Sequence, residues 1–108
     1  MERINVKIIT KTPPHGRCKM FTSIVWLLIH YYKNTTINII PEIYKNSDDP
    51  DAPNFIVNGK IVEPSNTIYV SGEDIINAMN EAGAEPYEEV KPDAIKFDEI
   101  IEKCLSWY

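Results

Sequence analysis

Residues 13–20 read PPHGRCKM and lie between an apolar, strand-like run and the most hydrophobic helical stretch of the chain. The two prolines lack amide protons and push the residues before them out of the helical region, so the stretch begins as a loop. From Cys18 to about Lys33, apolar residues recur at helical spacing, which predicts a helix. The stretch is therefore a strand-to-helix junction, and it holds one of the two cysteines and one of the two histidines.

Four apolar, β-branched runs around this junction predict the strands of one sheet. They cover residues 4–10, 35–43, 54–57 and 60–63. The last two runs are joined by Asn58 and Gly59, a pair typical of a two-residue hairpin turn. Residues 67–70 either extend the fourth strand or form an additional edge strand.

Two more helices are predicted beyond the first. Ser71 and Asp74 form a near capping box at the start of a helix that Gly83 ends. Residues 93–108 place a stripe of apolar side chains on one face, which predicts a last helix. Residues 44–52, between the second and third strands, are polar and too short for a full helix.

The predicted order is β-α-β, a short connection, a β-hairpin, a helix and an added helix. The first two strands flank a helix and should therefore be parallel, with a right-handed crossover, and the hairpin adds antiparallel strands. We expect an α/β fold in which residues 1–83 form the domain and residues 84–108 form a linker and a C-terminal helix packed on it. That helix is expected to cover the apolar surface of the first helix around Trp26 and Ile29.

The composition excludes several classes of protein. The chain has 108 residues, 44% of them hydrophobic, which suits one domain with its own core. A net charge of −5 and the lack of a basic stripe argue against binding to nucleic acid. The longest apolar run, residues 24–29, is too short to cross a bilayer, and no secretory signal precedes the first strand. From these two observations we expect a cytoplasmic protein that makes no contact with membranes. Two cysteines are too few for a disulfide framework.

Four local matches, in the correct order, resemble the thioredoxin/glutaredoxin superfamily. Residues 15–20, HGRCKM, resemble the thioredoxin active-site run Cys-Gly-Pro-Cys-Lys-Met at the same strand-to-helix junction. Ala52 and Pro53 precede the third strand, where the family has a cis-proline that faces the thiols. Residues 55–62 resemble its hairpin, and residues 71–76 resemble the start of its last helix, most closely in small archaeal and bacterial thioredoxin–glutaredoxin hybrids.

This resemblance covers roughly residues 3–83. It implies a thioredoxin-like βαβ-ββα three-layer fold with a central mixed four-stranded sheet, a shortened second helix and an extra C-terminal helix. The chain departs from the family at the active site, because His15 stands where the family has its nucleophilic cysteine and Cys18 matches the second, resolving cysteine. The dithiol cycle is therefore unavailable, and the resemblance leaves Cys18, with His15 and Arg17, as the site of any thiol chemistry.

The resemblance also implies a substrate-binding cleft. Pro14, Ala52 and Pro53 would line it beside Cys18, and the backbone of Ala52 would pair with an extended substrate segment. The amide of Gly72 opens a helix and could hold a carboxylate, as glutaredoxin-type proteins do with glutathione.

The physical chemistry of Cys18 leaves its reactivity open. In the first turn of a helix, free amides and the macrodipole favour negative charge, and Lys11, Arg17 and Lys19 add positive charge nearby. These effects favour a reactive thiolate, and His15 could reach the sulfur. Burial in apolar surroundings acts the other way and would make Cys18 a small hydrophobic residue of the core.

Two functions remain open. In the first, Cys18 performs thiol–disulfide exchange or senses oxidation with a protein or peptide partner, which would make the protein a monothiol oxidoreductase. In the second, the protein is a redox-inert module that binds a peptide or partner protein in the Cys18/Pro53 cleft. Neither function requires a cofactor, and His15 with Cys18 supplies too few ligands for a metal.

The C-terminal helix has an alternative role as well. It or the first helix could form a dimer contact, with Cys104 in or near it. A disulfide between Cys18 and Cys104 would require the last helix to reach the active-site end of the molecule.

Overall fold

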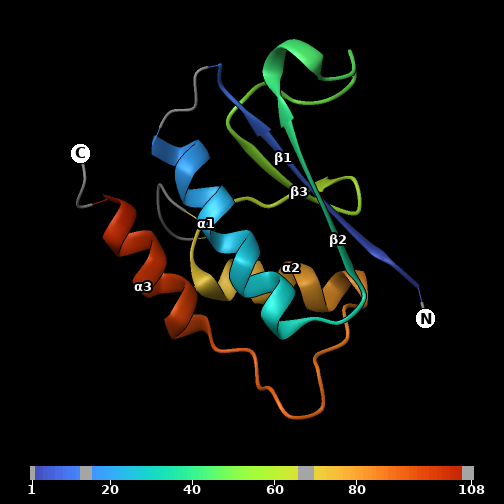
Figure 1. Cartoon of the computed structure of the whole chain (residues 1–108), viewed down its shortest axis with the longest axis vertical. Helices are drawn as coiled ribbons and strands as arrows, with labels where there is room; N and C mark the ends of the chain where they lie inside the picture. The colour runs from blue at the N-terminus through green and yellow to red at the C-terminus, as the bar shows by residue number, and fades with distance from the viewer. Residues whose placement is uncertain (1, 13–15, 66–69, 106–108) are drawn as a thin grey trace.

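The computed structural model of the chain describes residues 2–12, 16–65 and 70–105. Its elements are, in order, β1 Ile4–Thr10, α1 Gly16–Tyr31, β2 Thr35–Pro41, the 3-10 helix η1 Glu42–Tyr44, β3 Asn54–Val57, β4 Lys60–Ile61, α2 Gly72–Ala82 and α3 Ala94–Leu105 (Figure 1). The sheet has the order β2-β1-β3-β4, with β1 and β2 parallel and the other pairs antiparallel. The expected α/β class with a mixed four-stranded sheet is confirmed. Residues 67–70 are expected to extend the fourth strand or to form an additional edge strand. Of these, residues 67–69 lie outside the part of the chain that the structure describes.

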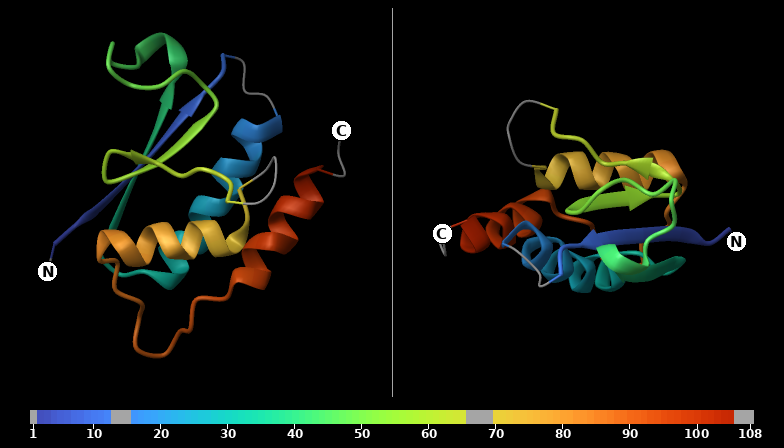
Figure 2. Two further views of the ribbon diagram at one scale, coloured as in Figure 1. Left: turned by 180° about the vertical axis from the view of Figure 1, so that it is seen from behind. Right: turned by 90° about the horizontal axis from the view of Figure 1, so that it is seen from above.

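One face of the sheet carries the main core and all three helices. β1 directs Ile4, Val6 and Ile8 to this face, and Phe55 and Val57 of β3 join them. α1 lies over β1 and β2, α2 lies against β3, and α3 packs against both α1 and α2 (Figure 2). The core is therefore closed by the helices on one side of the sheet only.

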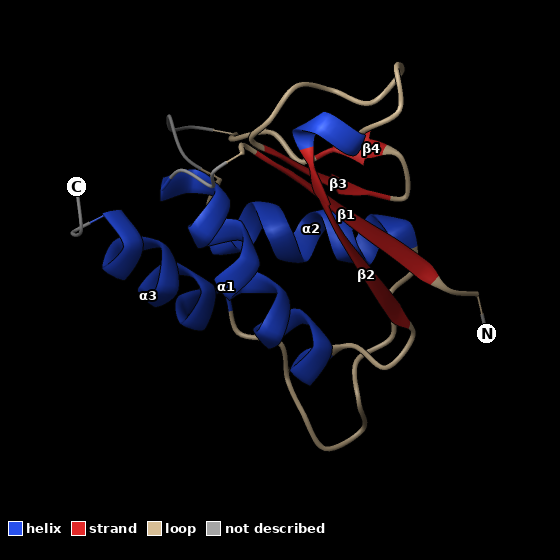
Figure 3. Ribbon diagram, turned by 45° about the horizontal axis from the view of Figure 1, so that its top comes forward, coloured by secondary structure: helices blue, strands red, loops and turns tan. Residues whose placement is uncertain are grey.

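The opposite face of the sheet is covered by a loop. Ile9, Ala52 and Ile56 form a small second core there. The chain between β2 and β3 contains only the short helix η1, as its polar sequence predicted (Figure 3). Asp49 in this loop accepts a 3.0 Å hydrogen bond from Nζ of Lys7. The third layer that the resemblance implied is therefore reduced to η1 and its loop.

The ends of α2 are those that the sequence predicts. The Ser71 hydroxyl accepts a hydrogen bond from the Asp74 amide at 3.2 Å, and the Asp74 carboxylate accepts one from the Ser71 amide at 3.0 Å. The helix ends at Gly83, whose φ of 89° suits a residue without a Cβ. The capping box and the glycine stop are both confirmed.

α3 packs on α1, but on a different side from the one predicted. The ring of Phe97 meets that of Tyr31 with centroids 5.6 Å apart. α3 packs against both α1 and α2, and its buried side chains join the main core there. Trp26 remains 75% exposed and Ile29 45% exposed. The prediction that the last helix covers these two residues was wrong.

Candidate functional site

Cys18 lies in the first turn of α1, at the carboxyl end of β1. Its side chain is fully buried, and its sulfur accepts a 3.2 Å hydrogen bond from the backbone amide of Lys11. This amide holds the thiol against the end of β1. A disulfide can approach Cys18 only if the surrounding chain moves, because a thiol needs access as well as thiolate character to react.

Ala52 and Pro53 lie at the same end of the sheet. The peptide bond between them is cis, as the resemblance implies. β3 begins at the next residue, Asn54, which pairs with Ile9 near the end of β1. This pairing lies near the end of β1, so Ala52 and Pro53, which directly precede Asn54, lie at the end of the sheet where the Lys11 amide binds the Cys18 sulfur. The sheet thus brings Cys18, Ala52 and Pro53 to one end of the molecule.

Of the charged residues expected around Cys18, the structure describes the side chains of Lys11 and Lys19. Nζ of Lys11 lies 3.5 Å from the Glu42 carboxylate, so its positive charge is paired. Lys19 is exposed on α1. Pro14 and His15 lie outside the described residues, as does the side chain of Arg17.

Gly72 is already engaged by another part of the chain. Its amide donates a 2.7 Å hydrogen bond to Oδ1 of Asp98 on α3. A Cβ at this position would overlap the carbonyl oxygen of Ala94, so α3 approaches as closely as glycine permits. A ligand carboxylate could bind the Gly72 amide only by displacing Asp98.

The start of α2 carries a second carboxylate. Burial acts against ionisation of Asp74, but hydrogen bonds from Ser71 and Ser65 outweigh it, so the pKa of Asp74 lies below its usual value. With Asp98 and Asp74 both present, two carboxylates already interact with the amides around the start of this helix. An external anion is therefore disfavoured there.

Sequence reasoning missed Asp98. The only signal was a single carboxylate at the edge of the apolar face of the last helix, four residues after Ala94. That pattern is also typical of an exposed residue. The pairing with Gly72 joins residues 26 positions apart and depends on how α3 packs.

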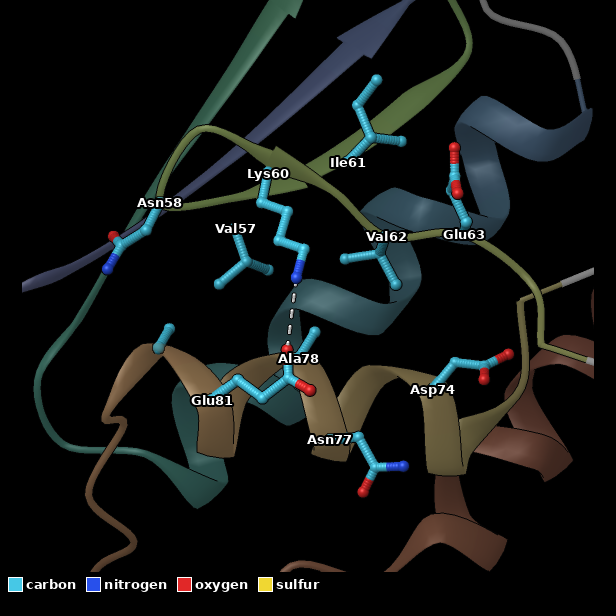
Figure 4. Close-up of a pocket in the computed structure, with 11 residues that line it drawn as sticks. Val57, Asn58, Lys60, Ile61, Val62, Glu63, Asp74, Asn77, Ala78 and Glu81 are labelled. Atoms are coloured by element: carbon cyan, nitrogen blue, oxygen red, sulfur yellow. Dashed lines mark ion pairs between the residues drawn. The ribbon is translucent and has the colours of Figure 1, made fainter.

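A separate cavity of about 590 Å³ lies between β4 and α2 (Figure 4). Its walls include Val62, Asn77 and Ala78, and the ion pair between Lys60 and Glu81, 3.5 Å apart, spans it. Of the expected site residues whose side chains the structure describes, namely Cys18, Ala52, Pro53 and Gly72, none lines this cavity.

Both cysteines are buried free thiols. Within the described ranges, the His, Cys, Asp and Glu side chains do not gather in any group of three or more that could hold a metal ion. None of the described helices combines the length and apolarity needed to cross a membrane. No family model matches the chain, and neither the curated proteins nor the solved structures gave a significant match.

Proposed function

We propose that this protein is a thioredoxin-like module that binds an extended segment of a partner protein at the Cys18/Pro53 end of its sheet, without turning over disulfides. The order of its elements and the position of Cys18 at the start of α1 support the resemblance to that superfamily. The chain segment 52–53 before β3 supplies the backbone that would pair with the partner, in the manner of strand addition.

The burial of Cys18 is the observation that favours binding over catalysis. A thiol that attacks a disulfide must meet a sulfur of its substrate in line, which requires an exposed sulfur atom. Cys18 has no exposed surface, and its sulfur is held by the Lys11 amide. With His15 in place of the first cysteine, no second thiol is present in the loop to relay electrons to it.

Monothiol exchange is the second candidate function. The Lys11 amide donates a hydrogen bond to the Cys18 sulfur, which lies in the first turn of α1. These contacts would support chemistry if partner binding exposed the sulfur. In that case Cys18 would form a mixed disulfide with a partner disulfide and release one partner thiol.

The alkylation rate of Cys18 separates the two candidates. It is measured with iodoacetamide in a Cys104→Ser variant, folded and in denaturant, across a range of pH. Binding without chemistry predicts that the folded protein reacts at least about a hundredfold more slowly than the unfolded chain, because reaction requires local opening. Fast alkylation of the folded protein at neutral pH would instead support monothiol exchange.

Binding is tested with an immobilised library of short extended peptides. For the peptides retained, we expect amide NMR shifts to change around Lys11, Ala52 and Asn54 and to stay constant around Lys60 on the far edge of the sheet. Shifts confined to the Lys60 edge, or no retained peptide, would contradict the proposed binding role.

A further inference from the structure

We propose that α1 and β2 form a self-complementary surface through which two copies of this chain associate. The surface, called here the α1–β2 patch, consists of Trp26 and Ile29 of α1 and Ile37 and Ile39 of β2. These residues line a hollow of about 330 Å³ whose other walls are Thr22, Ser23 and Val25. Trp26 is 75% exposed and Ile39 48% exposed, so the patch presents bulky apolar side chains to water.

The core accounts for only one side chain of the patch, since Ile37 packs against it whereas Trp26, Ile29 and Ile39 are exposed. α1 already buries its inner face, including Ile24 and Leu28, against the sheet and α3. Trp26 and Ile29 lie on the outer part of the helix, which α3 leaves uncovered. Large contiguous apolar areas on a folded protein are typical of contact surfaces.

β2 is an open edge of the sheet. Among the strands of the described residues it pairs with β1 alone, as the strand order shows (Figure 1). Natural proteins usually protect such edges with charged residues or prolines within the strand. β2 reads TTINIIP, without a charged residue and with its one proline at the end. Its backbone can therefore accept another strand.

The charge distribution favours a second copy as the occupant. The chain has 16 acidic residues against 11 basic ones, so two copies repel each other over most of their surfaces. Neither α1 nor β2 contains an aspartate or a glutamate. The α1–β2 patch is thus a face where two acidic copies can meet without opposing carboxylates.

The exposed side chains of the patch supply part of the area that a dimer needs. Trp26, Ile29 and Ile39 are 75%, 45% and 48% exposed. They present roughly 300 Å², given about 150–250 Å² for a large aromatic side chain, whereas a standard interface buries about 800 Å² per partner. The open backbone of β2 and the polar walls of the hollow, Thr22 and Ser23, would supply the remainder.

The simplest arrangement has a two-fold axis beside the middle of β2, near Asn38. Two copies of β2 then pair antiparallel and join the sheets into one, and Trp26 of each copy packs on the α1–β2 patch of the other. Such a contact is isologous and closed, so it yields a dimer and not a fibre.

Sedimentation velocity over a concentration series tests this proposal. We expect the whole chain to form a dimer that Trp26→Lys and Ile39→Lys each weaken, raising the dissociation constant at least about tenfold, because a buried tryptophan is a typical hot spot. Ile95→Lys is the matched control, since Ile95 is 64% exposed on α3 and lies outside the patch. Circular dichroism checks that every variant is folded.

Cysteine cross-linking tests the strand pairing. Under mild oxidation, Asn38→Cys should form a disulfide between two copies, and Lys60→Cys on the opposite edge should not. A chain that stays monomeric, a dimer that both patch variants leave unchanged, or equal cross-linking at the two edges would each overturn the proposal. A monomer whose β2 edge takes up an extended peptide in place of a second copy would overturn it too.

Discussion

Tyr31 and Tyr32 are adjacent in the sequence but differ in their hydrogen bonding. The Tyr31 hydroxyl is hydrogen-bonded to the backbone of Asp93. The Tyr32 side chain is 1% exposed, and its hydroxyl has no hydrogen-bond partner within the described part of the chain. A buried hydroxyl without a partner loses its bonds to water and gains none in the folded state.

Replacing each tyrosine by phenylalanine should therefore have different effects on stability. Tyr31→Phe should lower the free energy of unfolding by about 1 kcal/mol, because a hydrogen bond is lost. Tyr32→Phe should leave it unchanged or raise it by up to about 1 kcal/mol, because an unpaired hydroxyl is removed. Urea denaturation of both variants measures the difference. Equal losses would mean that the Tyr32 hydroxyl is hydrogen-bonded after all.

The same residue predicts a loss of stability in alkali. Burial, with a smaller contribution from Tyr31, raises the pKa of Tyr32 from 10.0 to about 12. Between these two values the unfolded chain has released the proton that the folded chain retains, so the free energy of unfolding falls as pH rises. The free energy of unfolding is unaffected by this titration below pH 10. The loss at higher pH amounts to about 2–3 kcal/mol, at 1.36 kcal/mol per pKa unit.

Stability measured from pH 9 to 12 checks this expectation. Wild type should lose more free energy of unfolding over this range than Tyr32→Phe, which has no group to titrate at that position. Parallel curves for the two proteins would contradict it.

At the scale of the elements, α3 is fixed to the start of α2 by Asp98. Its carboxylate accepts a 2.7 Å hydrogen bond from the Gly72 amide, and the close approach of Ala94 requires a glycine at position 72. Cys104, further along α3, is 3% exposed and thus reports whether the helix is docked.

Asp98→Ala should increase local opening of α3. Losing the acceptor for a buried amide costs about 1–3 kcal/mol, so alkylation of Cys104 should accelerate at least about fivefold. The rate is measured in a Cys18→Ser background, so that one thiol is observed. Glu102→Ala, which changes an exposed carboxylate of the same helix, is the control. Unchanged alkylation in Asp98→Ala would show that Asp98 does not hold α3.

At the scale of the whole molecule, the segment after Gly83 is part of the same folded unit. The Glu85 amide donates to Oδ1 of Asn34 at 2.9 Å, and the Tyr87 amide donates to the carbonyl of Tyr31 at 3.0 Å. α3 then adds its buried side chains to the core that α1, α2 and the sheet share.

Truncation after Gly83 should therefore destabilise residues 1–83 strongly. Removing Phe97 alone resembles a large-to-small core substitution, which costs about 3–5 kcal/mol, and the linker contacts are lost in addition. Thermal unfolding followed by circular dichroism compares the truncated and full-length chains. A truncated chain with an unchanged melting temperature would contradict this prediction.

The local elements and the position of the candidate site could be predicted from the sequence. The spacing of apolar residues, the Asn58-Gly59 turn and the Ser71/Asp74 capping box each depend on residues a few positions apart, so the chain itself specifies them. The same reasoning located Cys18 at the strand-to-helix junction. It could not establish that the thiol is fully buried, because burial depends on segments far away in the sequence.

Only the tertiary structure decided which faces are covered and which amides are free. Helical periodicity shows that α1 is apolar on several sides, but not that α3 covers the side with Tyr31 and leaves Trp26 in water. It also shows that an amide opens α2 at Gly72, but not that Asp98 occupies it. The physical reason is that periodicity is fixed by neighbours along the chain, whereas burial and long-range hydrogen bonds are fixed by how the helices pack.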